Sequence, residues 1–210
     1  MHRLFFAIFP DPPALAALQR IAGTLQDANT LRGRWISPHQ YHATVRFIGD
    51  YDDEHAAATI ESARAAAGDV PFARFPIVLD RVATFRGRFR APCVLRCSSE
   101  CEAPIQSLWQ QLGERLAGAG ISGGDERRFL PHVTIAYSRV DADVAPYATA
   151  LAGVVQPPTT VPITAVTLIR QERLLAPHWQ YRWTVEAVAQ LGAPPSVSAG
   201  HREIAQQLDL

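Results

Sequence analysis

Most of this chain consists of two kinds of segment. Short runs are apolar or alternate between apolar and polar residues, and the longer stretches between them have apolar residues at helical spacing. The pattern predicts strands at residues 4–9, 41–48, 75–79, 92–97, 132–137, 161–169 and 181–188. It predicts helices that begin after Asp11, after Asp52 and at Pro104, and a short helix at residues 144–151. The predicted helices and strands are grouped along the chain, and each half of the chain carries a similar motif. This arrangement indicates an α+β protein of two similar lobes.

The composition changes near residue 188. Beyond it the chain is rich in Gly, Ala, Pro and Ser and has no strand pattern. We therefore expect residues 1–188 to form one bilobal domain and residues 189–210 to be a flexible tail.

Two of the predicted strands have nearly the same sequence, His-Ala-Thr-Val-Arg-Phe at residues 42–47 and His-Val-Thr-Ile-Ala-Tyr at residues 132–137. A chain with this many His and Thr residues is expected to contain about 0.4 His-x-Thr matches by chance. Two matches, each on a strand and each with an aromatic residue at the same offset, therefore indicate a functional pair. The alternative is a half-buried strand that carries a hydrogen-bonded histidine.

Alternation along a strand places His and Thr of one motif on the same face. The residues predicted to face outward are His42, Thr44, Arg46, His132 and Thr134. The aromatic residues five positions after each histidine, Phe47 and Tyr137, are predicted to face the core.

Two imidazoles and two hydroxyls suit acid–base chemistry on a phosphodiester. Neutral and protonated imidazole accept and donate protons near pH 7. The threonine hydroxyls can donate to non-bridging oxygens, where charge builds up in the transition state. This chemistry requires no metal, and the near-symmetry of the motifs leaves open which histidine is the acid.

The composition excludes several other kinds of site. All 20 basic residues are arginine, which rules out a lysine nucleophile, a Schiff base or an adenylylated lysine. The net charge is zero, so no global field attracts a polyanion. Cys93, Cys97 and Cys101 are odd in number and fit no usual ligand spacing, so we expect buried thiols rather than disulfides or a metal site. The first apolar run is too short for a signal peptide, which favours a cytoplasmic protein without a membrane segment.

The paired motifs resemble those of the 2H phosphoesterase superfamily, and most closely the family of RNA 2′,3′-cyclic phosphodiesterases, also called 2′-5′ RNA ligases. The resemblance extends over about residues 3–186 in order and spacing. The segments that carry it are residues 3–8, 34–36, 42–49, 131–135 and 166–170. It implies two pseudo-symmetric lobes whose antiparallel sheets form a central cleft, with helices on the outside.

The resemblance also implies an activity, which is metal-independent hydrolysis of RNA 2′,3′-cyclic phosphate ends to 2′-phosphomonoesters, without a cofactor. His42 would be the general acid and His132 the general base, assisted by Thr44 and Thr134. The implied partners are RNA ends or nucleotides that carry a cyclic phosphate. No interface signature is present, so we expect a monomer.

One position departs from the family pattern. The RNA cyclic phosphodiesterases usually have an arginine five residues after the second histidine, where this chain has Tyr137. Tyr137 itself and Arg46, Arg139 or Arg88 are our candidates for substrate binding. Two other functions remain open: a weak ATP-independent 2′-5′ RNA ligase, and a non-catalytic RNA- or nucleotide-binding module.

Overall fold

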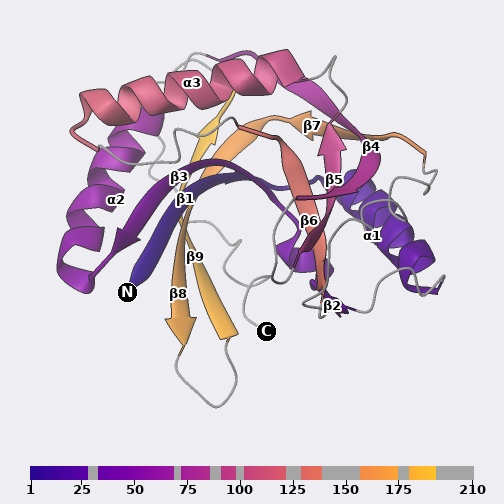
Figure 1. Cartoon of the computed structure of the whole chain (residues 1–210). Coiled ribbons are helices and arrows are strands. Elements are labelled where there is room, and N and C mark those ends of the chain that lie inside the picture. The colour runs from indigo at the N-terminus through magenta and orange to yellow at the C-terminus, as the bar shows by residue number, and fades with distance from the viewer. Residues whose placement is uncertain are drawn as a thin grey trace.

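The predicted strands pair into two antiparallel sheets (Figure 1). The structure is a computed structural model, and it describes residues 1–27, 33–68, 72–85, 91–97, 102–121, 129–138, 157–174 and 180–192. The first sheet, sheet A, has the order β3-β1-β8-β9. Its strands are β1 (His2–Ile8), β3 (Ala43–Tyr51), β8 (Ala165–Leu174) and β9 (Gln180–Gln190). The second, sheet B, has the order β2-β6-β5-β4-β7. Its strands are β2 (Gly33–Trp35), β4 (Phe75–Thr84), β5 (Pro92–Cys97), β6 (His132–Ser138) and β7 (Thr159–Ile163).

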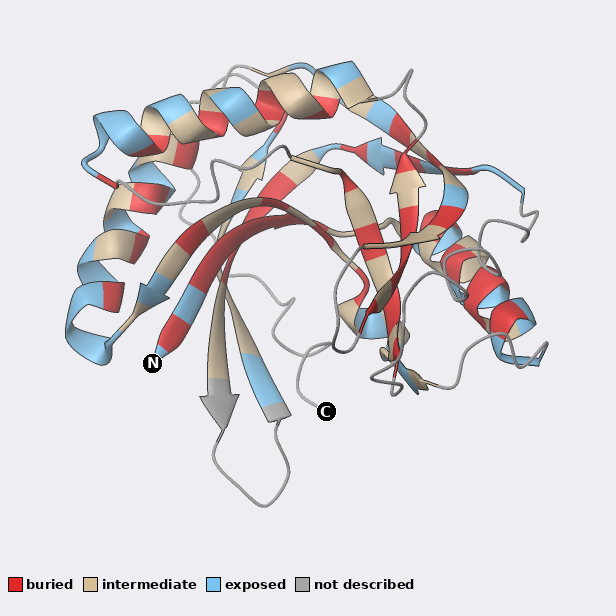
Figure 2. Cartoon of the chain, in the orientation of Figure 1, coloured by how far each residue is buried: buried red, intermediate tan, exposed pale blue. Residues whose placement is uncertain are grey.

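The three α-helices within the described residues lie on the outer sides of the sheets (Figure 1). They are α1 (Pro12–Asp27), α2 (Asp53–Gly68) and α3 (Glu102–Gly118). Two helices begin directly after an aspartate, as predicted: the Asp11 carboxylate accepts the Ala14 N–H at 3.1 Å, and Asp52 accepts the His55 N–H at 2.9 Å. Figure 2 shows the buried side of each helix turned toward the strands. The α+β class with two antiparallel sheets is therefore confirmed.

One hydrophobic core connects the two sheets. Its buried members include Leu4 and Phe6 of sheet A and Leu79, Leu95 and Ile135 of sheet B. The buried apolar stripe of α3 packs against it and consists of Ile105, Leu108, Leu112 and Leu116. Because the sheets share this core, the motif carried by each sheet is held in a defined position relative to the other.

The structure differs from the sequence prediction at residues 161–169. This apolar run is two strands, β7 and β8, which belong to different sheets and are separated at Thr164. The Thr164 carbonyl accepts the N–H of Leu191 at 2.8 Å. Both strands are apolar, so the hydrophobic pattern does not show where the chain leaves one sheet for the other. The sequence pattern also does not predict two short elements, β2 and the 3₁₀ turn η1 (Pro38–Gln40).

The packed part of the chain extends beyond the boundary predicted at residue 188. Strand β9 continues to Gln190, and Leu191 is fully buried. The Gly192 N–H then donates to the Phe72 carbonyl at 2.7 Å. Residues 193–210 and the helix predicted at 144–151 lie outside the described residues.

The two cysteines that the structure describes, Cys93 and Cys97, are buried on β5, as expected. Cys101 lies outside the described residues. Among the helices that the structure describes, none has the length and apolar character needed to cross a membrane.

Candidate active site

The two motif strands come from different sheets and lie next to each other. Strand β3 is at the edge of sheet A and contacts β6 of sheet B. His42, just before β3, and Thr44 line a cavity of about 880 Å³, which Tyr137 of β6 also lines. His132 begins β6, near enough for its charge to act on His42. The fold thus brings together two motifs that are 90 residues apart in sequence.

Both histidine rings are held by the same kind of hydrogen bond. His42 Nδ1 lies 2.8 Å from the Gln40 carbonyl oxygen, and His132 Nδ1 lies 2.7 Å from that of Leu130. A carbonyl oxygen only accepts, so Nδ1 must carry the proton in each ring. In the neutral form Nε2 of each ring therefore has the free lone pair. Each motif uses the carbonyl two residues before its histidine, so the local geometry is repeated.

The surroundings of the two rings differ. His42 lies among aromatic side chains, with ring centroids 4.8 Å from Trp183, 5.6 Å from Phe5 and 6.1 Å from Phe9. His132 contacts Phe85 at 4.7 Å and is the cross-strand partner of Arg96. The cation beside His132 makes the two sites electrostatically unequal.

Burial is the main influence on both titrations. It lowers the pKa of His42 below 6.5, the ordinary value for histidine; the bond to Gln40 opposes this, and the charge of His132 adds to it. Burial likewise lowers the pKa of His132, the bond to Leu130 raises it, and Arg96 lowers it. The two rings therefore resist being protonated together.

A β-bulge in each motif changes which side chains face the cleft. In the pairing of β3 with β1, Thr44 and Arg46 lie opposite consecutive residues of β1, so Val45 is the extra residue of a bulge. In the pairing of β6 with β5, Thr134 and Ala136 lie opposite consecutive residues of β5, so Ile135 is the extra residue. Both bulges are three residues after the motif histidine. A bulge inserts one extra residue and so reverses the alternation beyond it.

The predicted core positions of the two aromatic residues are therefore wrong. Phe47 pairs with Phe5, packs on that side of sheet A and lines the cavity. Tyr137 lines the same cavity from sheet B. Burial raises the pKa of Tyr137, so its hydroxyl keeps its proton at neutral pH and is a hydrogen-bond donor.

Arg46 faces the opposite side of the sheet, which corrects its prediction as a cleft residue. It pairs with Phe6 of the core, and its guanidinium carbon lies 4.6 Å from the centroid of Trp109 on α3. Gly113 leaves room for it, because a Cβ at that position would lie 2.9 Å from Arg46 Cζ. Arg46 of β3 thus packs against α3 through a cation–π contact with Trp109.

Three arginines near the motifs were not among the predicted site residues: Arg3, Arg34 and Arg96. Arg3 and Arg34 line the cavity, and Arg34 pairs across the β2–β6 ladder with Tyr137. Arg34 precedes the Trp35-Ile36 pair that contributed to the family resemblance, but only the register places it beside Tyr137. The predicted substrate residues Arg88 and Arg139 lie outside the described residues.

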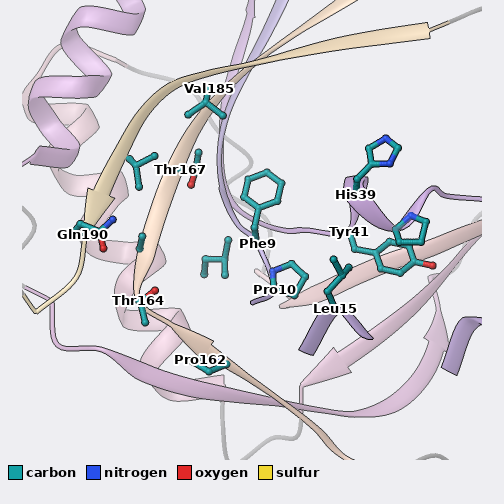
Figure 3. Close-up of a pocket in the computed structure, with 14 residues that line it drawn as sticks. Phe9, Pro10, Leu15, His39, Tyr41, Pro162, Thr164, Thr167, Val185 and Gln190 are labelled. Atoms are coloured by element: carbon teal, nitrogen blue, oxygen red, sulfur yellow. The ribbon is translucent and has the colours of Figure 1, made fainter. Parts of the chain in front are cut away.

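A second cavity, of about 430 Å³, has neither motif histidine among its lining residues (Figure 3). Phe9, Leu15 and Val185 are among its mostly apolar lining residues. His39 is at this cavity, and its ring is hydrogen-bonded to Ser37 Oγ at 2.7 Å. Within the described ranges, no three His, Cys, Asp or Glu residues are grouped so as to hold a metal ion.

Comparison with known proteins agrees with this geometry. A family model described as the 2′-5′ RNA ligase superfamily matches residues 9–174. A protein of Geobacillus stearothermophilus named RNA 2′,3′-cyclic phosphodiesterase is 29% identical over 192 residues, which are 90% of this chain and 58% of that protein. The chain thus spans somewhat more than half the length of this relative.

Solved structures have the same fold. The crystal structure of E. coli LigT in apo form matches with a TM-score of 0.65 and 20% identity, over 90% of this chain and 97% of that chain. E. coli LigT complexed with 3′-AMP matches with a TM-score of 0.64 and 18% identity, over 91% and 98% of the two chains. The resemblance inferred from the paired motifs is confirmed.

Proposed function

Because the chain belongs to the 2′-5′ RNA ligase superfamily, we propose that it hydrolyses RNA 2′,3′-cyclic phosphate ends to 2′-phosphomonoesters. The main support for the proposal is the pair of His-x-Thr motifs. Both histidine rings are hydrogen-bonded through Nδ1 to a backbone carbonyl, so Nε2 of each ring can accept or donate a proton. The name of the Geobacillus stearothermophilus relative supports the same reaction.

The proposed reaction assigns one proton transfer to each histidine. Neutral His132 accepts a proton from water at Nε2 as the water oxygen bonds to phosphorus. Protonated His42 donates from Nε2 to the 3′ oxygen as its bond to phosphorus breaks, which leaves a 2′-phosphate. Arg96 supports this direction, since its charge disfavours the imidazolium form of its neighbour His132.

The hydroxyls of Thr44 and Thr134 are proposed to donate to the non-bridging phosphate oxygens. Tyr137, whose hydroxyl remains protonated, is proposed as a further donor from sheet B. All proton transfers and donors then come from side chains of the chain itself, so we propose that the reaction needs no metal ion.

The proposal is tested with a short RNA that ends in a 2′,3′-cyclic phosphate, incubated with the protein in EDTA. We expect complete conversion to the 2′-phosphate, resolved from the 3′-phosphate by chromatography. A 3′-phosphate product would show that the bond from phosphorus to the 2′ oxygen is cleaved, which would contradict the proposed direction of ring opening. Loss of activity in EDTA, restored by a divalent cation, would contradict the metal-independent mechanism. Tight binding without turnover would favour a nucleotide-binding module.

The pH dependence of kcat/KM is expected to be bell-shaped, with its maximum below 6.5. The acid must be protonated and the base neutral, and burial lowers the pKa of both rings. As the pH rises above both pKa values, His42 loses the proton it has to donate. As the pH falls below them, His132 gains a proton and no longer accepts one. The profile is measured from about pH 4.5 to about 8.5 at constant ionic strength. A maximum above pH 7 would contradict these protonation states.

A further inference from the structure

The cavity at the motifs is positively charged, although the chain as a whole is neutral. Its charged lining residues are Arg3 and Arg34, and none of its described lining residues is a carboxylate. Such a cavity favours a ligand with more negative charge than one cyclic phosphate diester provides.

Arg34 is available to a ligand. Its side chain is exposed, and its guanidinium carbon lies 5.5 Å from the centroid of the Tyr137 ring. Among the residues that the structure describes, no carboxylate pairs with Arg34. Arg3 differs, because its guanidinium donates to both carboxylate oxygens of Asp50, at 2.9 and 3.1 Å. Arg34 is therefore the stronger candidate for a phosphate contact.

The positions of residues along β1 and β3 place Arg3 at a distance from the reacting phosphate. Thr44 is the cross-strand partner of Ala7, Phe47 is that of Phe5, and Arg3 is two residues further along. Arg3 is four residue steps along the strand from Ala7, which is about 13 Å. A phosphate held by Thr44 is thus followed by an aromatic surface and then by a cation.

Residues of sheet B line the cavity as well. Tyr137 lines it from β6, and Arg34 lies beside Tyr137 on the neighbouring strand β2. Tyr181 of β9 lines the same region from sheet A. Arg3 and Arg34 thus approach one end of the cavity from different sheets. The sequence of phosphate donors, aromatic rings and arginines matches the order of phosphate, nucleoside and phosphate in a polynucleotide.

We propose that Arg34, assisted by Arg3, binds the internucleotide phosphate that precedes the cyclic phosphate. The substrate class is then an oligonucleotide end rather than a free cyclic mononucleotide. This inference rests on the proposed function.

The kinetic test compares three substrates that share one reacting group. They are adenosine 2′,3′-cyclic phosphate, its 5′-phosphorylated form, and the dinucleotide ApA with a terminal 2′,3′-cyclic phosphate. We expect kcat/KM to be at least about tenfold higher for the two substrates with the additional phosphate, mainly through KM. The preference should shrink as salt is added, because the contact is electrostatic.

The variant Arg34→Gln should reduce this preference to less than about twofold, and Arg34→Lys should keep part of it because charge remains without the planar guanidinium. Arg20→Gln is the matched control, since Arg20 is an exposed arginine on α1, away from the cavity. Equal losses on all three substrates in Arg34→Gln would overturn the proposal, because Arg34 would then act on the reacting phosphate.

A binding measurement separates this inference from the proposed reaction. Calorimetry compares adenosine 3′-phosphate with adenosine 3′,5′-bisphosphate and does not depend on turnover. We expect the bisphosphate to bind at least about tenfold more tightly to the unaltered chain, and the difference to disappear in Arg34→Gln. Equal affinities in the unaltered chain would overturn the subsite. Absence of turnover with this affinity difference intact would overturn the reaction alone.

Discussion

Asparagine in place of His42 or His132 lowers kcat on the cyclic phosphate by about 10²- to 10⁴-fold. The asparagine amide can still donate to the carbonyl that holds Nδ1, at Gln40 or at Leu130. The local fold should therefore persist while the proton transfer at Nε2 is lost. Single-turnover rates measure the loss, and thermal unfolding verifies that each variant is folded.

The two variants should also differ from each other in their pH profiles. Without His42 the alkaline limb disappears, because that limb reports the proton of the acid. Without His132 the acidic limb disappears. His55→Asn is the control, because His55 is an exposed histidine at the start of α2. A folded variant of either motif histidine with an unaltered rate would show that the motif pair does not carry out the reaction.

Valine in place of Thr44 or Thr134 lowers kcat by about 10²-fold, with a smaller effect on KM. Valine has the shape of threonine and suits a strand, so the change removes a donor with little disturbance of packing. The loss falls on kcat because the non-bridging oxygens gain charge in the transition state.

The control for the threonine variants is Thr160→Val, an exposed threonine on β7 outside the cavity. Steady-state kinetics with the cyclic-phosphate RNA separates kcat from KM. If both motif variants kept the unaltered kcat and only KM rose, the hydroxyls would bind the substrate without stabilising the transition state.

Helix positions could be read from the chain because they depend on local chemistry. Asp11 and Asp52 precede their helices and accept backbone N–H groups, and the apolar stripe of α3 packs on the core. The sequence pattern also predicts the longer strands, but it misses β2 and gives residues 161–169 as one strand. Its two halves have the same apolar character, and only the pairing partners distinguish them.

The direction of side chains beyond the motif threonines could not be read from the chain. Alternation predicts that Arg46 faces the cleft and that Phe47 and Tyr137 face the core. The bulges at Val45 and Ile135 reverse these positions. A bulge forms where the pairing of two strands requires it, and those strands are distant in sequence. The sequence pattern does not place Arg34 at the site for the same reason, since only the β2–β6 register brings it to Tyr137.

The sequence by itself identified the family and singled out the two histidines and the two threonines as candidate site residues, because a motif that occurs twice is a local pattern. The tertiary structure alone decided which aromatic and cationic side chains surround those histidines. Those positions depend on strand register, on bulges and on the contact between β3 and β6 of different sheets. Register is a property of paired strands, and a shift of one residue turns every later side chain to the other face.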